Sequence, residues 1–135
     1  MSDSFGIEKT PYEAIGGDEQ VRALVDVFYD HMDRDASFAT IRALHPADLA
    51  ESRLKLYEFL CGWLGGPELY VTKRGHPRLR ARHMPFPIGE VERDQWLDCM
   101  QLAMDERGVD GDLRRFLDHR FAHVANFMRN REEGA

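Results

Sequence analysis

This sequence has few cysteines, no long apolar run and no excess of positive charge. Only two cysteines occur in 135 residues, Cys61 and Cys99. Both lie within apolar patterns, which predicts buried reduced thiols rather than a disulfide. No apolar run approaches the roughly 20 residues that span a bilayer, and the first ten residues lack the pattern of a signal peptide. We therefore expect a cytoplasmic protein that does not bind membranes.

The formal net charge is -6, with acidic and basic residues interspersed along the chain. No basic stripe is available to neutralise phosphates, so we expect neither nucleic acid nor anionic lipid as a partner. The length and the hydrophobic content of 43% suit one compact domain. We predict a single domain over residues 1–135, with flexible ends at 1–10 and 131–135.

Apolar residues recur three and four positions apart in several segments, which indicates amphipathic helices. In residues 18–34 this stripe comprises Val21, Leu24, Val25, Phe28 and Met32. Residues 11–15 have room for a turn or two of helix, and residues 36–44 for a short helix that ends before Pro46. Longer helices are predicted from Leu49 to Trp63, with Glu58 on its polar side, from about Gly89 to Arg107 and from about Asp110 to Asn130. No strand pattern occurs, so the predicted fold class is all-α.

Residues 67–87 lose this periodicity and contain four arginines and several prolines. We predict a long loop here with about one helical turn. Long loops inside a compact domain usually have a function, so this segment is the first place to search for a site.

Six histidines are present, and none belongs to a zinc signature. His119 and His123 stand four apart at the border of a helical stripe, which favours surface or half-buried side chains over a metal clamp. His31 lies between acidic residues and is predicted to be solvated. His83 differs because it follows an arginine-rich segment and precedes apolar residues, a setting that suits a ligand with an anionic rim and an apolar face. From these residues alone, a structural or exposed histidine is still the more common alternative.

Three ordered segments, residues 65–70, 75–86 and 92–100, resemble the group II truncated haemoglobins. The similarity begins near Tyr12 and extends to the last helix, so it covers nearly the whole chain. The resemblance implies an all-α truncated globin, in which a two-over-two helical sandwich encloses haem b.

The resemblance also implies roles for particular residues. His83 matches the proximal histidine that binds iron. Tyr29 and Trp96 match distal residues whose O–H and N–H groups can donate hydrogen bonds to bound dioxygen, although Trp96 equally suits an ordinary core position. His45 matches a distal corner position, where it either donates to the ligand or approaches the sixth iron position. Tyr29 is the alternative sixth ligand.

Further positions match the walls and the edge of the haem pocket. Ser52 and Leu56 fall on the distal helix, and Phe86 follows the proximal histidine. For the haem propionates the resemblance favours Arg82 and Tyr70, with Arg80 and His76 as weaker candidates.

The function that this resemblance implies is reversible binding of O2, CO and NO, by a monomer or a homodimer. The alternative is a haem redox enzyme that acts on nitric oxide, peroxide or nitrite and takes electrons from a separate reductase. A cofactor-free helical interaction module is a third hypothesis, which would leave the Arg82-His83 loop without a purpose. A gas sensor ranks last, because we find no output domain in the sequence.

Overall fold

The computed structural model describes residues 9–130, and every regular element in that part of the chain is helical. The four long helices are α2 (Asp18–Arg34), α4 (Ala50–Trp63), α7 (Glu90–Glu106) and α8 (Gly111–Phe127). The shorter elements are α1 (Pro11–Ile15), a 3-10 turn (Ala36–Phe38), α3 (Ala39–Arg42), α5 (Leu69–Arg74) and α6 (Leu79–His83). The predicted all-α class is confirmed.

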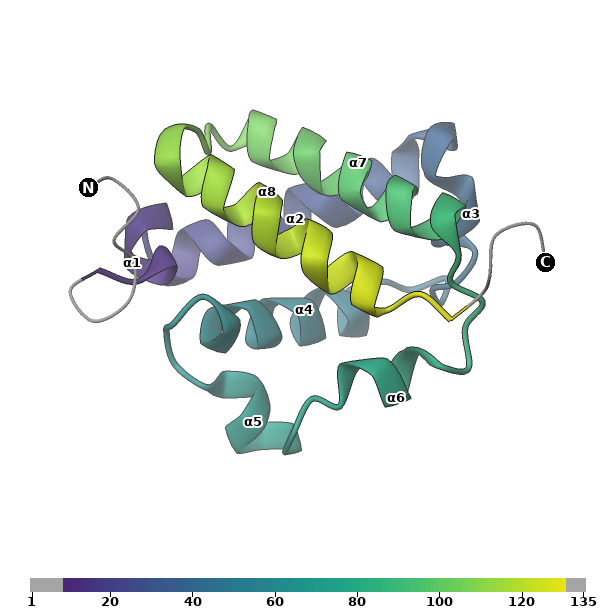
Figure 1. Ribbon diagram of the computed structural model, residues 1–135, viewed down its shortest axis with the longest axis horizontal. Helices are drawn as coiled ribbons and strands as arrows, with labels where there is room; N and C mark the ends of the chain where they lie inside the picture. The colour runs from purple at the N-terminus through teal and green to yellow at the C-terminus, as the bar shows by residue number, and fades with distance from the viewer. Residues whose placement is uncertain (1–8, 131–135) are drawn as a thin grey trace.

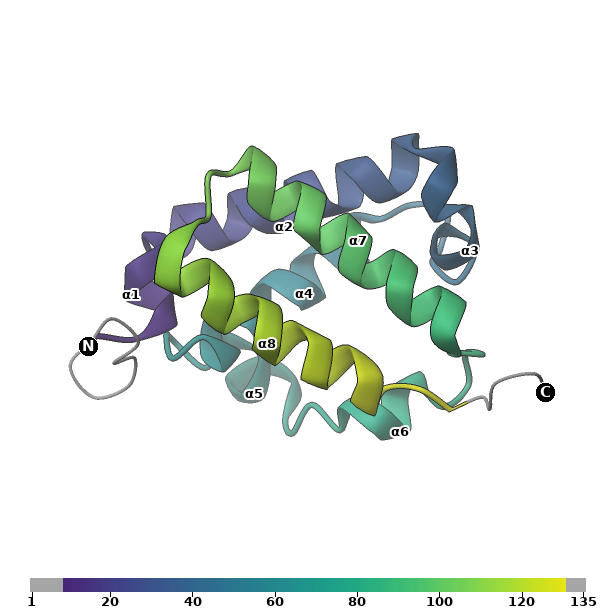
Figure 2. The same cartoon turned by 45° about the horizontal axis from the view of Figure 1, so that its top comes forward.

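The long helices form two antiparallel pairs, α2 with α4 and α7 with α8 (Figure 1). The two pairs are joined by close packing of α2 on α7, which cross at an angle in Figure 2. Below α8 in Figure 1, the chain passes through α5 and α6 before it returns to α7. The segment that carries His83 therefore lies outside the four long helices and is bonded to the end of α8 through Arg80.

The core is formed by the stripes that the sequence predicts. All five apolar residues of the α2 stripe are buried, and Phe28 has no exposed surface. Both cysteines are free and buried, as predicted, and the Cys99 thiol donates to the Phe28 carbonyl at 3.1 Å. Apolar burial is the largest favourable contribution to folding, and α2 packs against α1, α3, α4 and α7, so α2 is the central helix of the fold.

A tight corner at the end of α4, packed on α1, fixes where the chain enters α5. Gly65 adopts a φ of +97°, a left-handed conformation that favours glycine. At Gly66 a Cβ atom would lie 2.6 Å from the ring of Tyr12, so the α4–α5 corner packs directly on α1. Thr10 starts α1 with a capping box, in which it exchanges hydrogen bonds with Glu13. The rest of the predicted flexible ends, residues 1–8 and 131–135, falls outside the described residues.

The structure corrects three predictions about helices. Residues 67–87 contain two short helices, α5 and α6, rather than one turn. Helix α8 ends at Phe127 rather than near Asn130, because the last described residues turn to bond the segment after α6. Glu58 was predicted on the polar side of α4 but is only 6% exposed. Its carboxylate accepts from Arg74 at 2.8 Å and from Lys73 at 3.1 Å, which offsets the cost of burying it.

Within residues 9–130, no helix is both long enough and apolar enough to cross a membrane.

Candidate functional site

His83 is the last residue of α6, and its imidazole is fixed by the helix that carries it. Nδ1 lies 2.6 Å from the carbonyl oxygen of Leu79, one turn earlier. A carbonyl can only accept, so Nδ1 carries the proton and donates it. In the neutral ring the lone pair is then on Nε2, the tautomer that a metal-binding histidine uses when its second nitrogen is held.

The start of α6 is built by the arginine-rich segment. Arg78 precedes the helix with a φ of 48°, an uncommon left-handed conformation for a residue with a side chain. Its N–H donates to His76 Nδ1 at 3.0 Å. Arg82 Nε donates to the Pro77 carbonyl at 2.6 Å, so its side chain folds back over the turn. These contacts hold a helix that is too short to be stable alone.

His45 lies in the corner after α3 and is half-buried. Its Nδ1 donates to the Ile41 carbonyl at 2.8 Å, which again leaves Nε2 as the unprotonated nitrogen of the neutral ring. Burial lowers the pKa of His45 below its usual value, the bond to Ile41 opposes this, and the charges of Arg42 and His83 lower the pKa further.

Tyr29 lies beside His45, and their ring centroids are 5.7 Å apart. The Tyr29 side chain is 6% exposed and meets the Phe28 ring edge-on at 5.0 Å. Burial raises the pKa of its phenol well above 10, although the nearby Arg53 charge lowers it. The phenol therefore keeps its proton and can donate it to an acceptor in the site.

Trp96 belongs to a continuous row of aromatic rings that joins five helices, α2, α7, α8, α4 and α5. Its centroid is 5.3 Å from Phe28 and 5.6 Å from Phe121. Phe121 in turn stacks on Trp63 of α4 at 5.1 Å. The row continues from Trp63 through Phe59 to Tyr70, at 6.3 Å per step. We call this set the aromatic row; it consists of Tyr29, Phe28, Trp96, Phe121, Trp63, Phe59 and Tyr70.

Tyr70 is at the far end of the aromatic row and is buried between two cations. The guanidinium carbons of Arg74 and Arg82 lie 5.8 Å and 5.9 Å from its ring centroid. The structure thus brings together the two residues predicted to face the propionates, Tyr70 and Arg82. The two weaker candidates have other partners, since Arg80 donates to carbonyls at the end of α8 and His76 accepts from Arg78.

The other residues predicted to line the haem pocket differ in how far they are buried. Ser52 and Leu56 are half-buried on α4, one turn apart, and Leu56 packs against the core. Phe86 lies in the connection after α6 and is 40% exposed. Half-buried apolar side chains on α4 and α7 are the surfaces that an apolar cofactor would cover.

The remaining histidines lie elsewhere. His119 and His123 are exposed on α8, in agreement with the prediction. His31 was predicted to be solvated but is half-buried, and its Nε2 lies 3.0 Å from a carboxylate oxygen of Glu106 on α7. His31 therefore helps to join α2 to α7.

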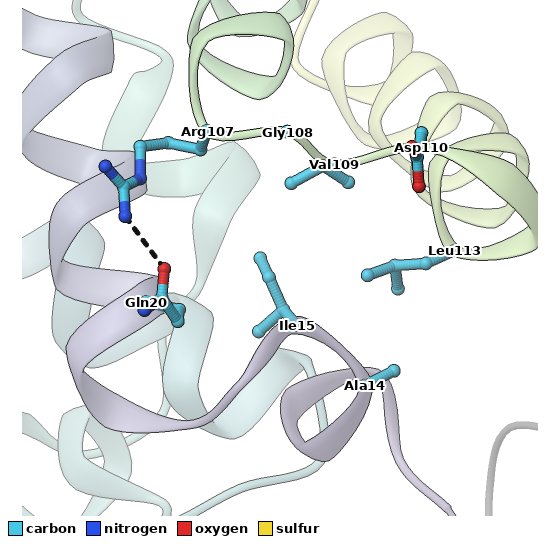
Figure 3. Close-up of a pocket in the computed structure, with 8 residues that line it drawn as sticks. All are labelled: Ala14, Ile15, Gln20, Arg107, Gly108, Val109, Asp110 and Leu113. Carbon is cyan, nitrogen blue, oxygen red and sulfur yellow. Dashed lines mark hydrogen bonds between the residues drawn. The ribbon is translucent and has the colours of Figure 1, made fainter.

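A separate surface pocket of about 180 Å³ lies between α1, the start of α2 and the α7–α8 connection (Figure 3). An Arg107–Gln20 hydrogen bond of 2.9 Å closes one side of it, and Ile15 and Leu113 point into it. None of the residues that line this pocket is a predicted site residue. It is therefore distinct from the region around His83 and His45.

Sequence reasoning missed the residues that hold the His45 corner. The Ile41 N–H donates to Gln95 Oε1 of α7 at 3.2 Å, while the Ile41 carbonyl accepts from His45. Arg42 donates to the carbonyls of Pro46 and Ala47, both at 2.9 Å, and pairs with Asp33. The one signal available was an arginine three residues before a His-Pro pair. It does not reveal which carbonyls the guanidinium reaches.

Residues 10–130 match the sequence model of the bacterial-like globins. The chain belongs to this globin family. Over 98% of its length it is 46% identical to the group 2 truncated haemoglobin YjbI of Bacillus subtilis, of which the match covers 96%. It is 49% identical to the group II 2-on-2 haemoglobin of Agrobacterium tumefaciens, with a TM-score of 0.89 over 94% of this chain and 98% of that structure. It is 45% identical to the truncated oxygen-avid haemoglobin of Bacillus subtilis, with a TM-score of 0.82 over 90% of this chain and the whole of that structure.

These likenesses confirm that this globin is a group II truncated haemoglobin with the two-over-two fold. Haem b is the cofactor of the family. The side chains of this globin fit such a group, because an imidazole with a free Nε2, a half-buried apolar wall and a cationic edge lie on connected elements.

Proposed function

We propose that this globin holds haem b through Nε2 of His83 and binds a diatomic gas, with O2 as the principal ligand. The observation that carries the proposal is the 2.6 Å hydrogen bond from His83 Nδ1 to the Leu79 carbonyl. This bond fixes the tautomer, orients the ring and makes Nε2 a better electron donor. When bound, haem would supply an iron centre that can bind a diatomic ligand.

Tyr29 is the proposed hydrogen-bond donor to that ligand. Its phenol is buried and protonated, and its ring is held between Phe28 and His45. A donor that is already oriented loses little conformational entropy when a ligand arrives. The Trp96 indole N–H is the proposed second donor, and the aromatic row limits how far its ring can move.

The proposed role of His45 differs from the donor roles of Tyr29 and Trp96. With Nδ1 donating to Ile41, the neutral ring has no proton on Nε2 and cannot donate from there. The lowered pKa of His45 favours this neutral form. Of the two roles open to His45, this tautomer supports approach to the sixth iron position when no gas is bound.

The proposed polar edge of the site is formed by Arg82 and Tyr70. A guanidinium and a phenol can both donate to a carboxylate, so the pair is suited to a haem propionate. The oxygen-avid character of the Bacillus subtilis relative supports retention of O2 as the main function.

The test is a visible absorption spectrum of the purified protein, recorded oxidised, reduced and under CO. We expect an intense Soret band that shifts with each treatment in the wild type. In His83→Ala the band should weaken or change character, whereas His119→Ala, an exposed histidine on α8, should leave it unchanged. Circular dichroism establishes that both variants fold. A folded protein that takes up no added haemin, or a His83→Ala spectrum identical to wild type, would refute the proposal.

A further inference from the structure

Asn130 joins the end of α8 to the segment that follows His83. Its side-chain Nδ2 donates to the carbonyl of His83 at 3.2 Å and to that of Phe86 at 2.9 Å. Its Oδ1 accepts from the Ile88 N–H at 3.0 Å, and its own N–H donates to the Ile88 carbonyl at 2.8 Å. One residue thus makes four hydrogen bonds to a segment more than 40 residues earlier in the chain.

The segment needs such a partner because of its sequence. Pro85 and Pro87 have no N–H groups, so the chain between α6 and α7 cannot continue a helix or make a regular turn ladder. The Phe86 N–H donates to the His83 carbonyl at 3.0 Å, and Asn130 adds a second donor to that carbonyl and provides donors for the Phe86 and Ile88 carbonyls. An asparagine amide has two N–H donors and one carbonyl acceptor, and can therefore satisfy carbonyls and an N–H at once. Aspartate, of the same shape, retains the acceptor and loses both donors.

A second residue makes the connection in the opposite direction. Arg80 of α6 donates from Nη1 to the Phe127 carbonyl at 2.7 Å and to the Arg129 carbonyl at 3.0 Å. These carbonyls are at the C-terminal end of α8, where helix carbonyls lack intrahelical partners. In Figure 1 the end of α8 accordingly lies beside the chain that leaves α6. Side chains from both partners therefore hold α6 and α8 together.

We propose that Asn130 is a positioning residue for His83, an inference that rests on the proposed role of His83 as the iron ligand. His83 is held at two points, its imidazole by the Leu79 carbonyl and its own carbonyl by Asn130. The first bond sets the rotation of the ring. The second fixes the position and tilt of the His83 backbone relative to the end of α8. Asn130 therefore acts on the iron–histidine bond without contacting the cofactor.

The experiment compares the holoprotein with Asn130→Asp, Asn130→Ala and the control Asn126→Asp. Asn126 is exposed near the same end of α8, and its Oδ1 accepts from Arg93 at 3.0 Å, so the control makes the same chemical change away from His83. Resonance Raman spectroscopy of the photolysed ferrous CO complex measures the iron–histidine stretching band. Transfer of haem to an excess of apomyoglobin measures the rate of haem loss, and urea unfolding of the apoprotein measures stability.

We expect the iron–histidine band to shift or broaden in both Asn130 variants and to keep its wild-type position in Asn126→Asp. Loss of two neutral hydrogen bonds should speed haem loss by about tenfold. An unfolding midpoint that falls while the band keeps its wild-type position would show Asn130 to be merely structural and would overturn the inference. A band that persists in His83→Ala would overturn the ligand assignment, and this inference with it.

Discussion

The substitution Tyr29→Phe should accelerate O2 release without disturbing the fold. It removes only the hydroxyl, and the ring keeps its contacts with Phe28 at 5.0 Å and His45 at 5.7 Å. A neutral hydrogen bond contributes about 0.5–1.5 kcal/mol net. Each 1.36 kcal/mol in a barrier is a factor of ten in rate, so O2 dissociation should rise about 2- to 13-fold. The upper part of this range is expected, because the phenol is 6% exposed and water cannot readily replace it.

The assay is stopped-flow displacement of O2 by CO, with dithionite to scavenge released oxygen. Tyr57→Phe is the matched control, because Tyr57 is another buried tyrosine, on α4, whose hydroxyl donates to Asp18. That variant should be less stable but release O2 at the wild-type rate. If Tyr29→Phe also released O2 at the wild-type rate, the proposed donor role of Tyr29 would be wrong.

Three further changes test other parts of the structure. Glu58→Gln should make unfolding less dependent on pH: burial raises the Glu58 pKa, but Arg74 and Lys73 lower it more, to below 4.5. The ion pairs of Glu58 with Arg74 and Lys73 therefore stabilise the fold above about pH 4.5. This stabilisation is lost as the pH falls through the pKa of Glu58 in the folded protein. Urea titrations from pH 3 to pH 7 check this, with Glu19→Gln, an exposed glutamate on α2, as the control. Gly66→Ala should cost about 1–3 kcal/mol of stability, because its Cβ would meet the Tyr12 ring; an unchanged urea midpoint would contradict the packing. His45→Phe should convert any low-spin ferric spectrum to high-spin, and a low-spin spectrum that persists would exclude His45 as the sixth ligand.

The long helices could be predicted from sequence because each repeats apolar residues at the helical period over several turns. In α2 all five predicted stripe residues are buried. The corners before α2 and after α4 carry glycine pairs, whose conformational freedom is itself a local signal. Resemblance supplied His83, Tyr29 and Trp96, and the structure shows the hydrogen bond and ring contacts around them.

Features that depend on distant partners could not be predicted in this way. Glu58 has the spacing of a surface residue, and only the fold brings α5 close enough to pair with it. The two helices within residues 67–87 are each too short to show a period. The tautomer of His45 depends on the Ile41 carbonyl, and the link between α8 and α6 depends on an asparagine that looks like the end of a helix. For Glu58 and Asn130 the deciding contact is tertiary, whereas the His45–Ile41 bond is local but needs the geometry of the corner after α3.

Phe121 lies between the two tryptophans of the chain, 5.1 Å from Trp63 and 5.6 Å from Trp96. The intrinsic fluorescence of this globin therefore comes from one connected cluster rather than from two independent reporters. Since Phe121 belongs to α8, a displacement of that helix changes the surroundings of both indoles together. Emission from the apoprotein, and its quenching as haemin is added, would therefore report on this aromatic cluster without any introduced label.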